Sequence, residues 1–595
     1  MVDHVFRFPI RPGSHGCIAS LHDLLGHHLK ELLRLLAPVS GEESVRINGY
    51  RLLNDPGGIY PLPRERLSDC FGQVNIQDFC EPRLEYFQNL IESILGFIDF
   101  EVDGQVVHVD GFRLNKLSPW LVPGGGASDL LAGAASRCNL NCRFCYNAGT
   151  STSLRFKPRD PDEEFEEILS RIKQYVPQGR LHIFPGIPGP CEVLAHPHII
   201  EILRALRAKT VEPLRIATNG SLLTPKMIES LREFAPLFLD ISLNSASLGR
   251  RRWLMRDHQP EVAINALDEL AKSNIPFSVV IVPWPFPSRK IMLDDLRETV
   301  GFADSHESAF IQVSLPGYSR FFSESVLFNH DAVWESLKSE ILQLRGHIGS
   351  PLIIRPGLFE EFEDPDRVNA PMIIGTVKNS PAARAGLQCG DRITRINGLR
   401  VKSRHQARSL LTILHQSTLN NGSITIERKK TTVEIKIPLS DYAYPYEPET
   451  STHLGAVFSS SGIPDAWIEG LQKVIISHRA SSVLVLSSRL VAPSIKKFLL
   501  QAMLPSGIEI HVCVPDNSYW GGNIFMGDLL VVQDFIDAIK KFIGKEGVCP
   551  DLVAIPASPF HLSGWGRDLT GRLYMEIEEE TGIKVALVKC NPLFD

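Results

Sequence analysis

Three cysteines within eight residues constrain this chain more than any other feature of its sequence. Cys138, Cys142 and Cys145 form a C-x-x-x-C-x-x-C run inside the stretch 136–146. Thiolates at this spacing can wrap one loop around a face of an iron–sulfur cluster, which normally takes four thiolates, so one iron would stay open for another ligand. Zinc is the alternative, but its tetrahedral site needs a fourth Cys or His nearby. None follows at that spacing, since the next cysteine is Cys191.

The run also carries an aromatic residue, Phe144, directly before its third cysteine. In this form it resembles the signature of the radical S-adenosylmethionine (SAM) enzymes. The resemblance implies that the three cysteines hold a 4Fe-4S cluster, that SAM binds the fourth iron, and that the Phe144 backbone meets the adenine. An electron from the cluster would cleave SAM and give a 5'-deoxyadenosyl radical that abstracts hydrogen from a substrate. The protein orients such a cofactor and excludes water.

The composition is that of an ordinary globular protein, with 44% hydrophobic and 22% charged residues. A length of 595 residues predicts about three or four domains. The formal net charge of -6 gives no reason to expect a nucleic-acid or anionic-membrane partner, and no apolar run is long enough to span a bilayer. Eleven cysteines without a signal peptide indicate reduced thiols or metal ligands, so we expect a cytoplasmic location.

The first 125 residues predict a mainly helical domain of unknown role. Apolar residues recur at helical spacing over 18–36 and 83–95, and a hairpin is expected around Asp103-Gly104. Pro123 and the three glycines after it mark a boundary. Three further cysteines in this region could form a second metal site with a histidine, or could be small buried hydrophobic residues; they are Cys17, Cys70 and Cys80.

Residues 126–357 alternate strand and helix, which is typical of a parallel α/β sheet. The resemblance implies the partial (β/α)6 TIM-like barrel of radical SAM enzymes. The six expected strands are 129–136, 180–184, 214–220, 237–244, 277–282 and 310–315. Parallel barrels place their chemistry at the C-terminal ends of the strands. The candidate site residues all follow such ends, so we expect them to meet at one rim.

Glu192 is the candidate for holding the SAM amino group. The family often carries Gly-Gly-Glu-Pro after its second strand, followed by His-Pro, and Glu192 keeps that spacing to His196 and Pro197. Pro190 and Cys191 stand where the two glycines would be. Because proline has no N–H, the SAM ammonium would be held by other atoms at this point.

Further residues of the SAM pocket are expected on the third and fourth strands. Asn219 belongs to a Thr-Asn-Gly sequence common in the family, although Asn-Gly also simply favours a turn. Ser242 and Asn244 are two residues apart, so on a strand they would share one face. The run Arg250–Arg252 could clamp a substrate carboxylate, but we expect a solvated charge run.

Residues 358–445 resemble a bacterial PDZ domain through the sequences 372–377, 380–387 and 390–398. Such domains add a peptide strand to a sheet edge and bind its terminal carboxylate with backbone N–H groups. The loop 367–371 lacks the glycines usual for that capture. Peptide binding and a purely architectural role therefore both stay open.

Residues 446–595 predict a C-terminal α/β domain of unknown function, with strands at 482–486, 508–514, 551–555 and 583–588. Its aromatic, glycine-rich loop 516–528 resembles an uncharacterised module of bacterial iron–sulfur oxidoreductases that combine a PDZ domain with a radical SAM core. Tyr519, Trp520 and Asn523 are candidates for a substrate surface or for a tight structural loop.

The interpretation is therefore a radical SAM enzyme that acts on an unidentified small-molecule or peptide substrate, with an electron donor such as flavodoxin or ferredoxin. A radical-type methyltransferase is one alternative, although no cobalamin-binding region is recognisable. A non-catalytic Fe-S/PDZ adaptor is the other. The altered glycines before Glu192 favour the adaptor, and the intact cysteine run favours the enzyme.

Overall fold

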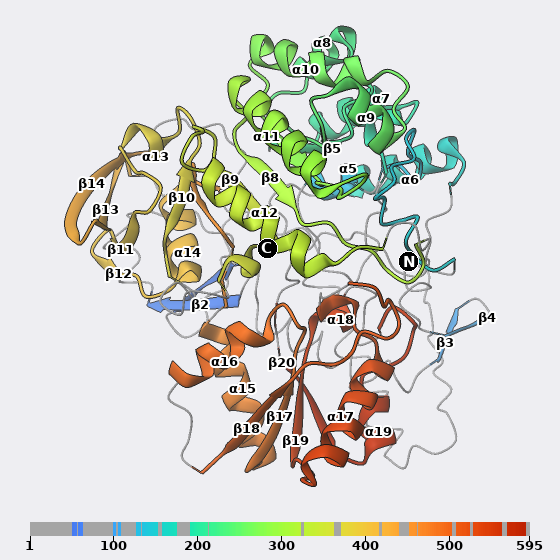
Figure 1. The fold of residues 1–595 in the computed structure, drawn as a ribbon, viewed down its shortest axis with the longest axis vertical. Helices are drawn as coiled ribbons and strands as arrows, with labels where there is room; N and C mark the ends of the chain where they lie inside the picture. The colour runs from blue at the N-terminus through green and yellow to red at the C-terminus, as the bar shows by residue number, and fades with distance from the viewer. Residues whose placement is uncertain are drawn as a thin grey trace, which may run out of the picture.

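Most of the chain after residue 126 is described by the computed structural model. The described ranges are 127–132, 134–152, 158–174, 191–211, 213–322, 327–361, 370–415, 419–439, 452–460, 462–463, 465–501, 507–523, 527–561, 568–588 and residue 590, with four short strands nearer the N-terminus. They form a barrel, a PDZ-like domain and a C-terminal α/β domain, which Figure 1 shows around a common centre.

The four N-terminal strands form two antiparallel hairpins. β3 (Asp99–Val102) pairs with β4 (Gln105–His108), which confirms the hairpin expected around Asp103-Gly104. β1 (Tyr50–Asp55) pairs with β2 (Gly58–Pro63), a hairpin that the sequence analysis did not predict. The helices predicted over 18–36 and 83–95 lie outside the described residues, as do the three N-terminal cysteines.

The barrel is built on five parallel strands in sequential order, which agrees with a partial TIM-like barrel. The strands are β5 (Leu214–Thr218), β6 (Leu237–Ile241), β7 (Phe277–Ile281), β8 (Ile311–Ser314) and β9 (Leu352–Arg355). Every residue of β6 and β9 is buried, as expected for strands covered on both faces. The connecting helices pack around this sheet (Figure 1): α8 (Pro225–Arg232), α9 (Leu248–Met255), α10 (Pro260–Ser273), α11 (Arg289–Ser305) and α12 (His330–Leu344).

The predicted first strand, 129–136, is wrong: the chain forms the helix α5 (Ala127–Ala132) there. A short apolar run does not distinguish helix from strand. Ala127, Leu130, Leu131 and Ala134 are all buried, at a spacing that fits one helix face. The predicted second strand, 180–184, lies outside the described residues, and β9 is a strand that the sequence analysis missed.

The PDZ-like domain combines two antiparallel sheets, in the orders β12-β11-β13-β14 and β10-β16-β15. Its elements are β10 (Ile373–Thr376), α13 (Pro381–Arg384), β11 (Arg392–Ile396), β12 (Leu399–Arg400), α14 (Arg404–His415), β13 (Asn421–Arg428), β14 (Thr431–Pro438), β15 (Thr452–His453) and β16 (Ala456–Phe458). β10 pairs with β16, so residues beyond the expected boundary at 445 take part in this domain's sheet.

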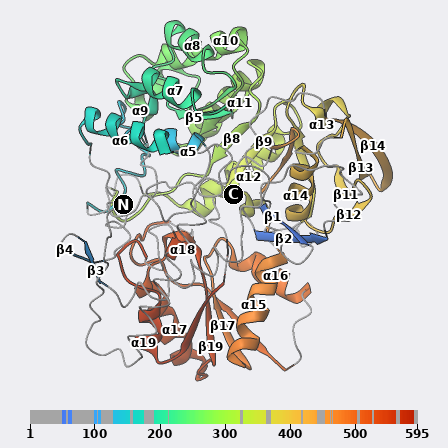
Figure 2. The same cartoon turned by 180° about the vertical axis from the view of Figure 1, so that it is seen from behind.

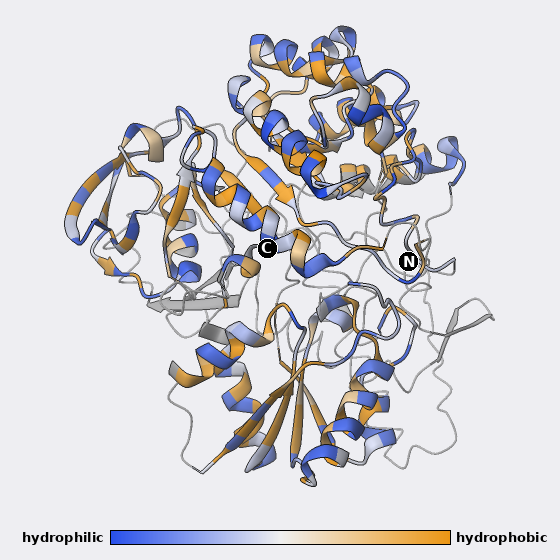
Figure 3. Cartoon of the chain, in the orientation of Figure 1, coloured by the Kyte–Doolittle hydropathy of each residue, from blue (hydrophilic) through white to orange (hydrophobic). Residues whose placement is uncertain are grey.

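The C-terminal domain has a parallel sheet in the order β18-β17-β19-β20. The strands are β17 (Ser482–Leu486), β18 (Glu509–Cys513), β19 (Leu552–Pro556) and β20 (Lys584–Val588), and all four were predicted. In Figure 3 they are strongly hydrophobic, in keeping with α15 (Asp465–His478), α16 (Ala492–Gln501), α17 (Val532–Glu546) and α19 (Met575–Thr581) around them. The chain leaves β17 toward β18 on one side and returns to β19 on the other, which creates a topological switch point.

The glycine-rich loop of the C-terminal domain docks on the loop that follows β8 of the barrel. Asn523 N–H donates to the Tyr318 carbonyl at 2.9 Å, and Arg320 N–H donates to the Trp520 carbonyl at 2.7 Å. Gly522 has φ +62°, and a Cβ there would lie 2.1 Å from the Tyr318 oxygen. The loop is therefore a clamp between domains, in keeping with a tight structural loop, and a substrate surface at Trp520 and Asn523 stays a prediction. Figure 2 shows the barrel and this domain from behind.

Within the part of the chain that the structure describes, every helix is too short or too polar to cross a membrane.

Candidate functional site

The cysteine loop is held against α9 through Arg143. Its N–H donates to the Leu254 carbonyl at 2.8 Å, and its Nε donates to the Trp253 carbonyl at 2.9 Å. The guanidinium also lies 4.5 Å from the centre of the Trp253 ring, within cation–π range. These contacts fix the middle of the loop, between Cys142 and Cys145, on the barrel.

An aromatic cluster lies behind the same loop. The Phe144 ring is 6.2 Å from the ring of Trp284, which is only 1% exposed. Phe328 meets Trp284 edge-on at 5.6 Å. Gly149, near the end of the loop, has no room for a side chain because a Cβ would lie 1.9 Å from Phe322. The cluster gives the loop an apolar backing.

Glu192 is buried, with 2% of its surface exposed, and both carboxylate oxygens accept hydrogen bonds. Oε1 accepts from Thr218 Oγ1, and Oε2 accepts from the Asn219 N–H, both at 2.6 Å. Its own N–H donates to the Arg137 carbonyl at 3.0 Å. Burial raises the pKa of Glu192, while the bonds from Asn219 and Thr218 act in the opposite direction. Glu192 thus joins the end of β5 to the start of the cysteine loop.

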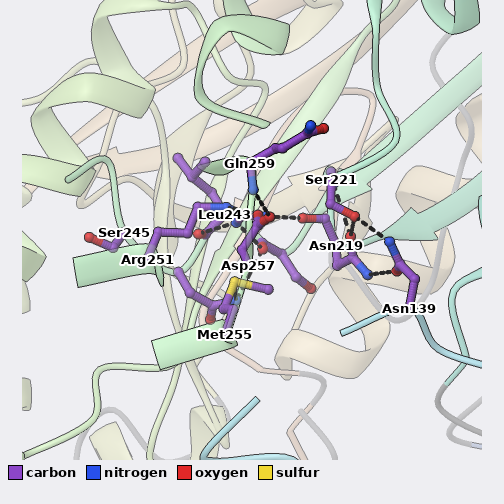
Figure 4. Close-up of polar contacts among 12 residues, drawn as sticks. Asn139, Asn219, Ser221, Leu243, Ser245, Arg251, Met255, Asp257 and Gln259 are labelled. Carbon is purple, nitrogen blue, oxygen red and sulfur yellow. Dashed lines mark hydrogen bonds and ion pairs between the residues drawn. The ribbon is translucent and has the colours of Figure 1, made fainter. Parts of the chain in front are cut away.

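Asn219 connects Glu192 to the first cysteine, and Figure 4 shows its contacts with Asn139 and Ser221. Its Nδ2 donates to the Asn139 Oδ1 at 2.9 Å and lies 3.8 Å from Cys138 Sγ, a hydrogen-bonding distance for sulfur. The Asn139 amide in turn donates to Ser221 Oγ at 2.8 Å. The structure therefore brings the predicted residues Cys138, Glu192 and Asn219 into one hydrogen-bonded network at the C-terminal end of β5.

Ser242 and Asn244 lie beyond the end of β6, so the same-face argument from strand geometry does not apply to them. Asn244 has φ +60° and is 2% exposed. Its Nδ2 donates to the Ser242 carbonyl at 3.0 Å, and its Oδ1 accepts from the Val282 N–H at 2.9 Å. The Asn244 amide thus stabilises the turn after β6. Its expected contact with SAM, and that of Ser242, stay predictions.

The expected solvated run Arg250–Arg252 is wrong for two of the three residues. Arg251 is 0% exposed, and its guanidinium donates to Asp257 Oδ2 at 2.9 Å, the Leu243 carbonyl at 2.6 Å and the Asn219 carbonyl at 2.6 Å (Figure 4). Arg250 is also buried, whereas Arg252 is exposed. Successive helix residues point about 100° apart, so the three side chains leave α9 in different directions, and two of them are buried here.

The three cysteines are close enough for their charges to act on one another. Burial raises the pKa of Cys142 to about 12, with further increases from Cys145 and Cys138, while Arg251 lowers it. Burial also raises the pKa of Cys191 to about 12, and Cys138 and Cys145 again contribute. A positively charged metal centre would offset the cost of ionising thiols in this setting.

The donor set fits a cluster with one open iron. In the described residues, no three His, Cys, Asp or Glu side chains converge closely enough to hold a single metal ion. A cubane cluster does not need that convergence, because each thiolate binds a different iron. Cys142 and Cys145 are half-buried and Cys138 is exposed, so a cluster bound by them would face the rim.

Sequence reasoning missed several residues that build this site. Thr218 could have been found, since it directly precedes Asn219 and is the last residue of the strand β5. Arg251 lies in the α9 sequence without any local sign of its burial. Trp284 follows β7 between two prolines, and its place behind Phe144 depends on the fold.

Comparisons with known proteins agree with this geometry. Residues 135–298 match the model of the radical SAM superfamily, and residues 373–418 match that of the PDZ domain. The radical SAM match covers the three-cysteine loop and the barrel strands β5, β6 and β7. The chain accordingly contains a radical SAM domain and a PDZ domain, and a radical SAM domain works with a 4Fe-4S cluster and SAM.

The similar curated proteins match only part of this chain. GTP 3',8-cyclase from Microcystis aeruginosa is 27% identical over 161 residues, which is 25% of this chain and 45% of that protein. The tungsten-containing aldehyde ferredoxin oxidoreductase cofactor-modifying protein of Pyrococcus furiosus is 32% identical over 105 residues, 16% of this chain and 25% of that protein. The chain thus spans less than two thirds of the relatives it matches.

Among solved structures, SuiB of Streptococcus suis bound to SAM is 17% identical, with a TM-score of 0.28 over 37% of this chain and 48% of SuiB. The same protein bound to its precursor peptide SuiA is 15% identical, with a TM-score of 0.30 over 57% of this chain and 62% of SuiB.

Proposed function

We propose that this protein is a radical SAM enzyme that cleaves SAM reductively and uses the resulting radical to abstract hydrogen from a substrate. Cys138, Cys142 and Cys145 are proposed to bind the cluster. Phe144, Glu192, Asn219, Ser242 and Asn244 are proposed to line the SAM pocket. When bound, the cluster and SAM supply the electron transfer and the 5'-deoxyadenosyl radical.

The network from Cys138 through Asn219 to Glu192 is the observation that carries this proposal. It joins the cysteine loop to a buried carboxylate at the end of one strand, which is where parallel barrels place their reactive groups. Burying a carboxylate costs free energy unless it is hydrogen-bonded or paired, and Thr218 and Asn219 supply the hydrogen bonds that hold Glu192 at this position.

Each residue of the network has a role that its contacts support. The Asn219 amide donates toward the Cys138 sulfur, and hydrogen bonds to ligand sulfurs tune the potential of an iron–sulfur cluster. The Glu192 carboxylate is fixed by two donors and presents negative charge for the SAM ammonium. The cluster of Trp284, Phe144 and Phe328 keeps water away from the inner side of the loop.

A peptide partner at the PDZ domain is part of the proposal, together with a separate electron donor. PDZ domains bind by adding an extended strand to a sheet edge. In this chain β15 lies along β16, and His453 is buried against α14, where Arg408 Nε lies 3.0 Å from its Nε2. β15 and β10 are the two edges of this sheet, so an added peptide strand would pair beside one of them.

The test is anaerobic reconstitution of the full chain with iron and sulfide, followed by dithionite and SAM. We expect about four irons per chain and production of 5'-deoxyadenosine. Cys142→Ala should lose the cluster and the product. Cys549→Ala is the matched control, because Cys549 is an exposed cysteine of the C-terminal domain, and it should keep both.

A wild-type chain that binds no cluster would contradict the proposal. A stable cluster that never cleaves SAM would favour the non-catalytic adaptor. Methyl transfer to an added substrate, with a second SAM consumed, would identify the methyltransferase alternative.

A further inference from the structure

Cys191 stands beside the proposed cluster site and has no part in the function described so far. It replaces a glycine of the sequence that usually precedes the SAM-binding carboxylate, and it follows directly on residues outside the described ranges. It is half-buried and makes no disulfide. Its position is set by the residue that follows it, Glu192.

A backbone hydrogen bond joins the segment that contains Cys191 to the segment that contains Cys138. Glu192 N–H donates to the Arg137 carbonyl at 3.0 Å, so the two segments run alongside each other at this point. Cys191 and Cys138 are each the immediate neighbour of a residue in that bond. The Glu192 side chain strengthens the attachment through Asn219, whose amide lies 3.8 Å from the Cys138 sulfur.

The charges of Cys138 and Cys145 both act on Cys191, as described above, so its sulfur is exposed to the field of the cysteine loop. Together with the hydrogen bond between Glu192 and Arg137, this places a fourth cysteine close to the cysteine loop. The three-cysteine loop leaves one iron of a cubane without a thiolate, while iron–sulfur clusters normally take four.

We propose that Cys191 binds the open iron of the cluster when SAM is absent and leaves it when SAM binds. This inference rests on the proposed function. The step is a ligand exchange without oxidation or reduction: the thiol gives its proton to water as the sulfur–iron bond forms. When the amino and carboxylate groups of SAM replace it, that bond breaks and the sulfur takes a proton back.

Such a ligand would protect the resting cluster. A cubane with one iron held only by solvent loses that iron when it is oxidised, whereas a fourth thiolate retains it. Displacing Cys191 would also cost part of the binding free energy of SAM, and each factor of ten in affinity corresponds to about 1.4 kcal/mol.

The experiment compares reconstituted wild-type protein with Cys191→Ala and Cys549→Ala, all without SAM. Each is treated with ferricyanide, and the three-iron cluster is measured by EPR, with iron counted chemically. We expect Cys191→Ala to lose about one of its four irons, while wild type and Cys549→Ala keep theirs. Mössbauer spectra of the ⁵⁷Fe protein should show one distinct iron only in Cys191→Ala.

Equal loss of iron from all three proteins would overturn the role of Cys191 and leave the proposed function intact. A wild-type protein that forms no cluster would instead end both proposals. Cys191→Ser supplies a second variant if the alanine protein folds poorly, since a hydroxyl is of similar size and a weaker iron ligand. Its iron loss should fall between those of wild type and Cys191→Ala, and loss equal to wild type would count against the proposal.

Discussion

The barrel and the C-terminal domain are both built on parallel sheets, yet their strand ends differ in chemistry. The barrel strands follow in sequential order, and around the C-terminal end of β5 lie Glu192, Asn219 and, from α9, Arg251, which are buried and hydrogen-bonded to one another or to the backbone. In the C-terminal sheet, which is also parallel, the chain goes from β17 to β18 on one side and then returns to β19 on the other side. The ends of β17 and β19 border a cavity lined by small and apolar residues. These include Val485, Ser487, Ala554, Ser558 and Val588.

The difference shows that the parallel α/β arrangement supplies a position and the side chains supply the chemistry. In the barrel, buried charges are arranged around the cysteine loop, where a charged cofactor could interact with them. In the C-terminal sheet the strand ends carry no comparable set among the described residues that line the cavity. We therefore assign the proposed chemistry to the barrel. The contribution of the C-terminal domain is the loop that docks on the barrel after β8.

Arg251→Met is expected to have the largest effect, and it tests whether the buried charge of Arg251 stabilises the barrel. The change leaves Asp257 without its buried partner and removes donors to three carbonyls, so we expect a loss of about 3–5 kcal/mol in the free energy of unfolding. Urea unfolding followed by tryptophan fluorescence measures it. Arg252→Met is the control on the same helix, because Arg252 is exposed and should change stability by less than about 0.5 kcal/mol. Similar losses in both variants would refute the role given to Arg251.

Glu192→Gln tests the proposed role of Glu192 in binding SAM, as distinct from a role in folding. Glutamine can accept only one of the two hydrogen bonds that Glu192 receives and carries no charge for the SAM ammonium. We expect SAM affinity to fall about 10- to 100-fold, which corresponds to about 1.4–2.8 kcal/mol, in equilibrium dialysis of the reconstituted protein. Glu229→Gln, at an exposed position of α8, should leave the affinity unchanged. Unaltered binding in Glu192→Gln would remove Glu192 from the pocket.

Gly522→Ala tests the link between the two sheets. The new methyl group would meet the Tyr318 carbonyl, and the positive φ is unfavourable for alanine, so we expect destabilisation of about 1–3 kcal/mol. Thermal unfolding and limited proteolysis of the clamp loop measure the effect. Gly544→Ala provides a glycine control in α17, where a Cβ meets nothing within 4 Å and alanine should stabilise the helix by up to about 1 kcal/mol. If the two variants behave alike, the clamp is not tight.

Mild acid should affect the barrel before the C-terminal sheet. Burial lowers the pKa of His196, whose Nδ1 accepts from the His198 N–H at 3.1 Å. A lowered pKa means that the unfolded chain takes the proton first, so this stabilisation is present above about pH 6.5 and decreases as the pH falls below it. Hydrogen-exchange protection of the His198 amide, corrected for intrinsic rates, should decrease between about pH 7 and 5.5. The exchange protection of the Gly547 amide, which caps the C-terminus of α17 by donating to the Ile543 carbonyl, should not change over this pH range. An unchanged His198 amide would contradict the assignment.

The sequence indicated which residues gather around β5 better than it indicated the elements around them. Cys138, Glu192 and Asn219 belong to short local motifs that resemble those of a known family, and the structure joins the three by hydrogen bonds, whereas their roles toward a cluster and SAM stay predictions. The burial of Arg251 depends on carbonyls from three separate segments, and nothing near it in the chain indicates this. Asn244 was expected on a strand face, but it lies in a turn that uses its amide internally. The helix α5 was predicted as a strand because a short apolar run is compatible with both a helix and a strand.

The clamp of the C-terminal loop also sets an order of assembly during synthesis. Tyr318 and its hydrogen-bond partner Asn523 are 205 residues apart in the chain. Domains emerge from the ribosome and fold from the N-terminus onward, so the barrel can form its sheet long before its rim loop finds that partner. Until residue 523 has left the ribosome, the loop after β8 lacks the hydrogen bonds that the C-terminal loop gives it. A chain that ends after the PDZ domain would therefore carry the cysteine loop on a barrel whose loop after β8 never gains these hydrogen bonds.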